Sequence, residues 1–145
     1  MYTFKKNERI TSLKEVDSLF ERGKSSAVGT FPVRAVFQTY PLPQTTPATP
    51  LIKILVSVAK KRLHHAVDRN RAKRQIREAY RLQRIRLTET IATINASADN
   101  PIALRIAFIW ISDKPQTTTR VSESVLKALT LIQHKISQQH TPDNQ

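Results

Sequence analysis

The spacing of apolar residues in this chain alternates between helical and extended patterns, and it predicts an order of elements. Residues 12–22 carry a helical apolar stripe that begins at a capping box of Ser12 and Glu15 and ends before Gly23. A second amphipathic helix is predicted over residues 118–136. Its apolar face consists of Val121, Val125, Leu129, Ile132 and Ile136.

Extended segments lie between these helices. A short extended piece is expected over residues 24–29, followed by a strand over 30–40 with Phe31, Val33, Ala35 and Phe37 on the core side. Residues 51–59 alternate in the same way, with Ile52, Ile54, Val56 and Val58 directed to the core and Lys53, Leu55 and Ser57 on the opposite face. The nearly continuous apolar run 102–111 suits a central strand covered on both faces. Residues 41–50 contain four prolines and no charge, which predicts an exposed loop.

The segment of residues 60–86 is the most unusual part of the chain, with eleven Lys and Arg residues and two acids. We expect most of it to form one helix. At 100° per residue, its apolar and basic side chains separate into neighbouring arcs. The apolar arc holds Ala72, Ile76, Ala79, Tyr80 and Leu87. The basic stripe, about 21 Å long at 1.5 Å per residue, holds Asn70, Lys73, Arg74, Arg77, Arg81 and Arg84.

Together these elements predict an α/β two-layer sandwich in the order αβββαβα. The basic helix and a polar link over residues 93–101 join two strands, which are therefore expected to be parallel. One domain over residues 1–137 is expected, with a disordered tail at 138–145 and fraying from Ser137 onward.

Composition narrows the class of protein. The chain has 145 residues, a formal net charge of +13 and no cysteine. Disulfides and Cys-based zinc sites are therefore excluded, and a nucleic acid is the expected partner. The sequence shows no signal-peptide pattern and no apolar run long enough to span a bilayer, so we expect a soluble cytoplasmic protein without a membrane partner.

We expect no intrinsic catalysis by this chain, because the common catalytic motifs are absent from its sequence. With only Gly23 and Gly29, the chain cannot form a Gly-rich phosphate loop, and it contains no G-x-S-x-G motif. The predicted strands carry no acidic pairs that could hold two Mg²⁺ ions. His64 and Asp68 are four residues apart, but a third ligand is absent. We therefore interpret them as part of the helix entry, where Asp68 complements the helix dipole.

A run of positive charge is often only a solvated helix face, but such faces normally mix Glu with Lys. Here Glu78 stands alone and Arg outnumbers Lys within the helix, which favours phosphate binding. Among the aromatic residues, Tyr80 and Trp110 are expected in the core. Phe20 has a core and a base-stacking interpretation, and both stay open.

The segment of residues 57–82 resembles the signature of the bacterial ribonuclease P protein subunit. That family carries a strand ending in S-V-x-K-K, a short spacer with an Ala, and a helix with R-N-R-x-K-R-x-[aliphatic]-R. The matching residues here are Ser57, Val58, Lys60, Lys61, Ala66, Arg69, Asn70, Arg71, Lys73, Arg74, Ile76 and Arg77. An F-x-x-G ending of the first helix, Phe20 to Gly23, also looks like the family.

The resemblance implies a left-handed β-α-β crossover and a division of labour in which RNA is the catalyst. The protein would bind the catalytic RNA and the single-stranded 5′ leader of precursor tRNA, as a monomer with one copy per RNA. Mg²⁺ would be used by the RNA, and the protein would bind no cofactor. The leader would lie in a cleft between the basic helix and the sheet. The residues expected to contact RNA are Phe20, Lys53, Ser57, Lys60, Lys61, Arg62, Arg69, Asn70, Arg71, Lys73, Arg74, Arg77 and Arg81.

Composition and architecture alone allow a ribosomal or ribosome-assembly protein equally well. The motif over residues 57–77 is what favours the ribonuclease P family. A helix-turn-helix DNA-binding module is disfavoured, because no second helix with a short turn precedes residue 66.

Overall fold

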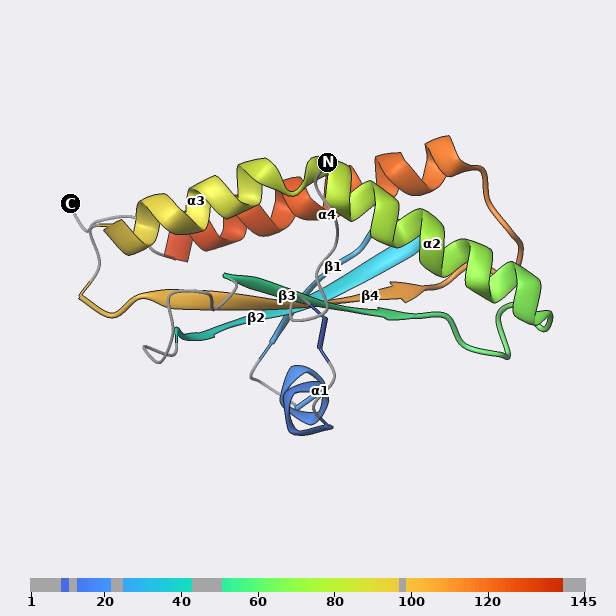
Figure 1. The fold of residues 1–145 in the computed structure, drawn as a ribbon, viewed down its shortest axis with the longest axis horizontal. Coiled ribbons are helices and arrows are strands. Elements are labelled where there is room, and N and C mark those ends of the chain that lie inside the picture. The colour runs from blue at the N-terminus through green and yellow to red at the C-terminus, as the bar shows by residue number, and fades with distance from the viewer. Residues whose placement is uncertain (1–8, 11–12, 22–24, 43–50, 97–98, 140–145) are drawn as a thin grey trace.

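A computed structural model describes residues 9–10, 13–21, 25–42, 51–96 and 99–139. Four helices and four strands occur in the described residues (Figure 1). In chain order they are α1 (Leu13–Leu19), β1 (Ser26–Val28), β2 (Val33–Pro41), β3 (Ile52–Ser57), α2 (Ala66–Gln83), α3 (Ile85–Ala96), β4 (Ile102–Trp110) and α4 (Thr118–Gln139).

The strands form one mixed sheet in the order β1-β2-β4-β3. β2 pairs antiparallel with both β1 and β4, whereas β3 pairs parallel with β4. The parallel pair is joined by α2 and α3, so the predicted parallel pairing is confirmed, although a single connecting helix was expected. Figure 1 shows α2, α3 and α4 on one face of the sheet and the short α1 on the other. The predicted α/β class and the central position of the 102–111 strand are therefore confirmed.

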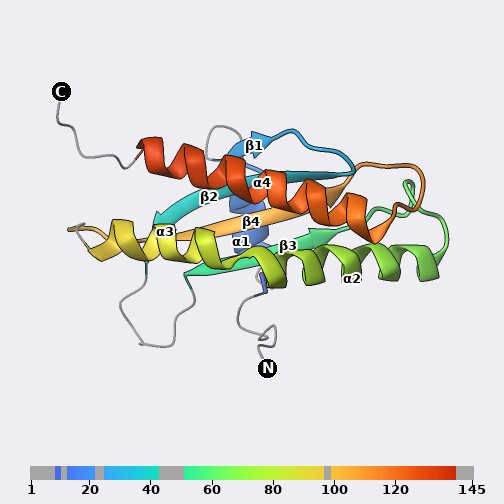
Figure 2. The same ribbon diagram turned by 90° about the horizontal axis from the view of Figure 1, so that it is seen from above.

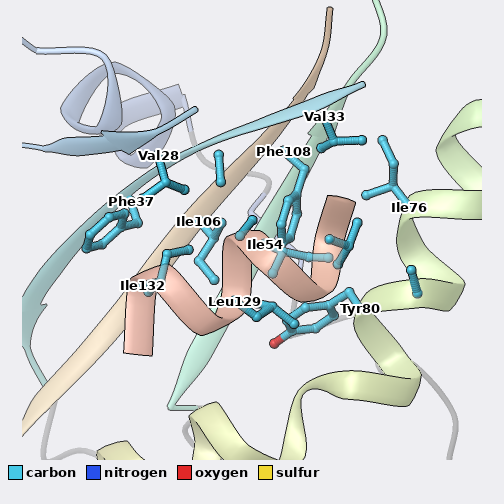
Figure 3. Close-up of a cluster of buried hydrophobic side chains, with 14 of the residues drawn as sticks. Val28, Val33, Phe37, Ile54, Ile76, Tyr80, Ile106, Phe108, Leu129 and Ile132 are labelled. Carbon is cyan, nitrogen blue, oxygen red and sulfur yellow. The ribbon is translucent and has the colours of Figure 1, made fainter. Parts of the chain in front are cut away.

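The main core lies between the sheet and the layer of three helices. Ile54, Ile106 and Phe108 project from the strands toward Ile76 and Tyr80 of α2 (Figure 3). Tyr80 and Trp110 are each about 1% exposed, so both are core residues as predicted. All five apolar residues predicted on the final helix are buried. These side chains fill the space between the three helices and the sheet.

The opposite face of the sheet carries a smaller apolar cluster under α1. Leu19 of α1 is fully buried there with Ile10, Val36 and Ala107. Leu55 is only partly buried against this cluster. The two faces therefore differ in how completely helices cover them.

The basic helix is broken into two, which the sequence analysis did not predict. α2 ends at Gln83, and α3 runs from Ile85 to Ala96 into the segment expected to be a polar link. The side-chain amide of Gln83 donates to the carbonyl of Ala79 (3.1 Å) and to the backbone carbonyl of Ser122 on α4 (3.2 Å). A side chain inserted at the hydrogen-bond ladder and tied to a neighbouring helix is a recognised cause of such a break. Leu87 and Ile91 then anchor α3 in the core.

Some predicted side-chain placements and element boundaries differ from those in the structure. Phe31, expected on the core side, is 50% exposed because it precedes the first residue of β2, so that placement is wrong. Ser137–Gln139, expected to fray, belong to α4. The predicted cap residues Ser12 and Gly23, most of the proline-rich loop (43–50) and the end of the tail (140–145) lie outside the described residues.

Candidate nucleic-acid interface

The helix α2 separates its apolar and basic side chains as its sequence pattern predicts. Ala72, Ile76, Ala79 and Tyr80 are each 5% exposed or less and pack into the main core. The polar side chains of the neighbouring arc line an open groove of about 460 Å³ on the outside of the molecule. The groove is lined by Arg9, Asn70, Lys73, Arg74, Arg77, Glu78 and Arg81. The predicted clustering is confirmed for Asn70, Lys73, Arg74, Arg77 and Arg81, whereas Glu78, which was not expected on the stripe, also lines the groove.

Arg9 belongs to this groove although it lies more than sixty residues before most of the other residues. Its segment pairs with β3 through an isolated parallel bridge between Arg9 and Ile54. The amide of Ile10 donates to the carbonyl of Ile54 at 2.8 Å, and the Ile10 side chain is buried. Arg9 was not predicted as part of this site, because a single bridge on an edge strand leaves no periodic pattern in the sequence.

The groove is strongly electropositive. Five of the side chains that line it are cationic, and Glu78 supplies one carboxylate. The pKa of Arg77 is lowered, first by its partial burial and then by the neighbouring charge of Arg9. Cations held this close favour an anionic ligand, because each bound phosphate relieves their mutual repulsion.

Glu78 holds Arg81 in place at the edge of the groove. The Nη2 and Nε atoms of Arg81 donate to the two carboxylate oxygens of Glu78 at 2.5 and 3.0 Å. These hydrogen bonds lower the pKa of Glu78 and raise the pKa of Arg81. Arg81 is thus a positioned cation rather than a freely rotating one.

The loop that enters α2 carries three more of the predicted cations. Lys60 and Lys61 are exposed in the turn after β3, whereas Arg62 forms an ion pair with Asp113 at 3.0 Å. Asp68 lies in the first turn of α2, as predicted. Arg62, one of the predicted RNA contacts, therefore also fastens two protein segments together. Arg69 does the same.

Arg69, predicted to contact RNA, makes hydrogen bonds within the protein. Its Nη1 donates to the carbonyls of Leu63 (3.0 Å) and His64 (2.8 Å), so it closes the entry loop onto the helix. Arg71 is exposed but does not line the groove.

Arg84, expected on the basic stripe, is only 5% exposed, with its guanidinium 5.7 Å from the ring centroid of Tyr80. Its placement on the stripe was wrong, because α2 ends just before it.

Lys53, Ser57 and Phe20 belong to the other face of the sheet. Lys53 and Ser57 alternate with Ile52, Ile54 and Val56 along β3 and share the face of Leu55, which packs toward α1. Phe20 follows α1 and is 51% exposed. The predicted cleft between the basic helix and the sheet was wrong, because core side chains fill that space. The exposure of Phe20 also excludes its core interpretation.

A second cation missed by the sequence analysis lies beside Lys53. Arg105 is paired in register with Lys53 across β3 and β4 and has the same facing. It donates to Gln38 at 2.9 Å, and its guanidinium lies 3.8 Å from the ring centroid of Tyr40. Gln38 donates in turn to the carbonyl of Ser18 in α1 at 3.2 Å. Arg105 could not be assigned to this site from the sequence, because a single Arg in an apolar strand gives no pattern beyond its own charge.

The part of the chain that the structure describes holds neither a cluster of metal-ligating side chains nor a membrane-spanning helix. Among residues 9–10, 13–21, 25–42, 51–96 and 99–139, no group of three or more His, Cys, Asp or Glu side chains could hold a metal ion. No helix within those same ranges is long and apolar enough to cross a membrane.

Comparisons with known proteins converge on one family. The family model described as Ribonuclease P matches residues 4–108. The ribonuclease P protein component of Porphyromonas gingivalis is 34% identical over 124 residues, covering 86% of this chain and 82% of that protein. The corresponding protein of Chlorobium phaeobacteroides is 30% identical over 112 residues, covering 77% and 74%. The solved structure of the Staphylococcus aureus RNase P protein aligns with a TM-score of 0.57 at 20% identity, covering 86% of this chain and 94% of that one, and so shares the fold.

Proposed function

The chain belongs to the ribonuclease P family as the protein component of that enzyme, and on this premise we propose that its basic groove docks on the enzyme's RNA. The observation that carries the proposal is the groove itself. In the described part of the chain, five cations from α2 and the N-terminal segment converge on one open surface with a single carboxylate among them. Arg side chains suit this contact, because their planar guanidinium groups bind phosphate oxygens in pairs.

The chemistry is assigned to the RNA. In this proposal the RNA binds Mg²⁺ and hydrolyses the phosphodiester bond that frees the mature 5′ end of tRNA. The protein contributes binding, one copy per RNA, and acts in the cytoplasm. Neutralising phosphates in the groove also lowers the Mg²⁺ concentration that the RNA needs, because fewer counterions must be supplied from solution.

The 5′ leader of precursor tRNA is assigned to the face of the sheet that α1 only partly covers. Phe20 offers an exposed ring on which a base can stack, and Lys53 and Ser57 offer a cation and a hydroxyl on β3. Arg105 adds a second guanidinium in register with Lys53. This surface replaces the space between the basic helix and the sheet as the place for the leader.

The test of this function is reconstitution. Precursor tRNA is incubated with a bacterial ribonuclease P RNA at a Mg²⁺ concentration too low for the RNA alone, with and without this protein. We expect the protein to restore cleavage at the mature 5′ end. The nuclease-cleared protein without RNA is the control and should not cleave. Failure of a correctly folded protein to stimulate the RNA would contradict the proposal.

A further inference from the structure

An apolar pocket lies at the break between α2 and α3, outside the sites assigned above. It has a volume of about 360 Å³ and is lined by Arg81, Leu82, Arg84, Ile85, Thr88 and Glu89. Leu82 and Ile85 are 63% and 64% exposed, although both are large aliphatic residues. Figure 2 shows α2 and α3 nearly end to end beside α4, so the pocket opens where one helix gives way to the next.

The pocket adjoins the basic groove at a shared lining residue. Arg81 lines both, so a chain of phosphates held in the groove passes directly beside the apolar pocket. Its ion pair with Glu78 fixes Arg81 at this boundary. The two hollows therefore form one surface with a cationic part and an apolar part.

We propose that this pocket receives the unpaired base of a nucleotide in the RNA whose backbone lies in the basic groove. The inference rests on the proposed RNA-docking function of that groove. Unpaired RNA bases are commonly splayed out and packed on apolar side chains or on guanidinium planes. The volume lies within the range of small-ligand pockets, roughly 300–1,000 Å³.

The chemistry of the lining distinguishes a base from other occupants. Leu82 and Ile85 offer an apolar surface for the face of a base, and Arg84 places a guanidinium beside Tyr80 at the inner wall. Glu89 repels a phosphate but can accept a hydrogen bond from the exocyclic amine of a base. The pocket thus takes the base while the groove takes the phosphates.

A second copy of the chain is a poorer occupant. Stable protein interfaces bury about 1,200–2,000 Å², whereas this patch is centred on two aliphatic side chains. The chain carries a net charge of +13, and Arg81 and Arg84 line the pocket. Two copies brought together here would place like charges against each other.

The first test removes the apolar surface. The double variant Leu82→Ser and Ile85→Ser should bind ribonuclease P RNA roughly tenfold more weakly, within the range expected for loss of one base contact. Its dependence of log K on log salt should match the parent, because no phosphate contact is lost. The matched control is Leu126→Ser, which changes an aliphatic residue of α4 that is 49% exposed. It should leave affinity unchanged.

The second test locates the base. The chain has no cysteine, so Leu82→Cys and Leu126→Cys each introduce a single attachment point for a photo-crosslinker. A probe at position 82 should crosslink to an unpaired nucleotide of the RNA, and one at position 126 should not. Unchanged affinity of the serine double variant, or crosslinks only to base-paired nucleotides, would overturn the pocket proposal.

These outcomes separate the pocket from the function on which it rests. If Arg74→Ala weakens RNA binding while the Leu82 and Ile85 changes do not, the groove stands and the pocket assignment fails. If neither Arg74→Ala nor the Leu82 and Ile85 changes affect RNA binding, the proposed function of the groove fails. Sedimentation of the free protein tests whether a second copy occupies the pocket. If the parent self-associates and the serine double variant does not, a second copy is the occupant and the base assignment is overturned.

Discussion

The two faces of the sheet are built for different tasks. On one face α2, α3 and α4 bury a continuous apolar core in which Ile54, Ile76 and Ile106 are at most 2% exposed. The seven-residue α1 lies on the other face (Figure 1). Lys53, Leu55 and Ser57 are half-buried there. We call the first of these the closed face and the second the open face. The closed face supplies stability, and the open face keeps polar and aromatic side chains accessible.

This difference explains how the molecule can bind two segments of RNA at once in the proposed function. The cations of α2 point away from the closed face into the basic groove, whereas Phe20 and Lys53 belong to the open face. The basic groove and the open face therefore lie on surfaces that can be altered independently by mutation.

The largest effect is expected from the closed face. Ile76→Ala removes a fully buried side chain and should lower the free energy of unfolding by about 2–5 kcal/mol. Leu55→Ala on the half-covered face should cost less, about 1–2 kcal/mol. Urea unfolding followed by circular dichroism measures both. Equal losses would contradict the contrast between the two faces.

The next largest effect concerns the open face. Phe20→Ala should weaken binding of precursor tRNA with a 5′ leader by about 1–3 kcal/mol, the usual contribution of one base stack. Binding of leaderless tRNA should stay the same. Phe31→Ala is the matched control, because Phe31 is an aromatic residue of similar exposure outside the open face. Identical behaviour of the two variants would remove Phe20 from the leader site.

A smaller effect separates a structural arginine from a binding one. Arg69→Ala removes hydrogen bonds to the carbonyls of Leu63 and His64 and should lower the free energy of unfolding by about 1 kcal/mol. Arg74→Ala, whose side chain is exposed in the groove, should leave stability unchanged and weaken only RNA binding. Thermal unfolding and RNA binding of both variants check this. A destabilised Arg74→Ala variant would show that the groove also supports the fold.

The smallest expected effect is a gain in RNA affinity. Among the described residues, Glu78 is the one carboxylate that lines the groove, so Glu78→Gln raises the groove charge and should tighten RNA binding about twofold. The folded-state pKa of Glu78 is lowered, so the stability from its contact with Arg81 is present near neutral pH and is lost as pH falls through that pKa. The parent should therefore lose slightly more stability on acidification than the Glu78→Gln variant. Weaker RNA binding by the variant would instead make the positioning of Arg81 the main role of Glu78.

Periodic features of the sequence predicted the fold well. The alternation in residues 51–59 and the apolar stripe of the final helix each depend on many residues, so one exception does not hide the pattern. The two arcs of α2 were predictable for the same reason. The break at Arg84 was not, because the apolar positions continue through Leu87 and no Pro or Gly marks the end of α2.

The candidate site was predictable only where it lies on one element. Lys73, Arg74, Arg77 and Arg81 share a helix face, and the helical period brings them together. Arg9 and Arg105 join their clusters through strand pairing between distant segments, which no local pattern encodes. The face of the sheet on which Phe20 and Lys53 lie likewise depends on where α1 packs.

The central claim is that the basic groove binds RNA through phosphates, and its salt dependence is the most direct test. If the groove and the Lys60–Lys61 pair make about six phosphate contacts, log K should fall against log salt with a slope near −4 to −5, at roughly 0.7–0.9 per phosphate. The double variant Arg74→Ala and Arg77→Ala should reduce the magnitude of that slope by about 1.5, whereas Phe20→Ala should not change it. A folded double variant with the slope and affinity of the parent would contradict the account.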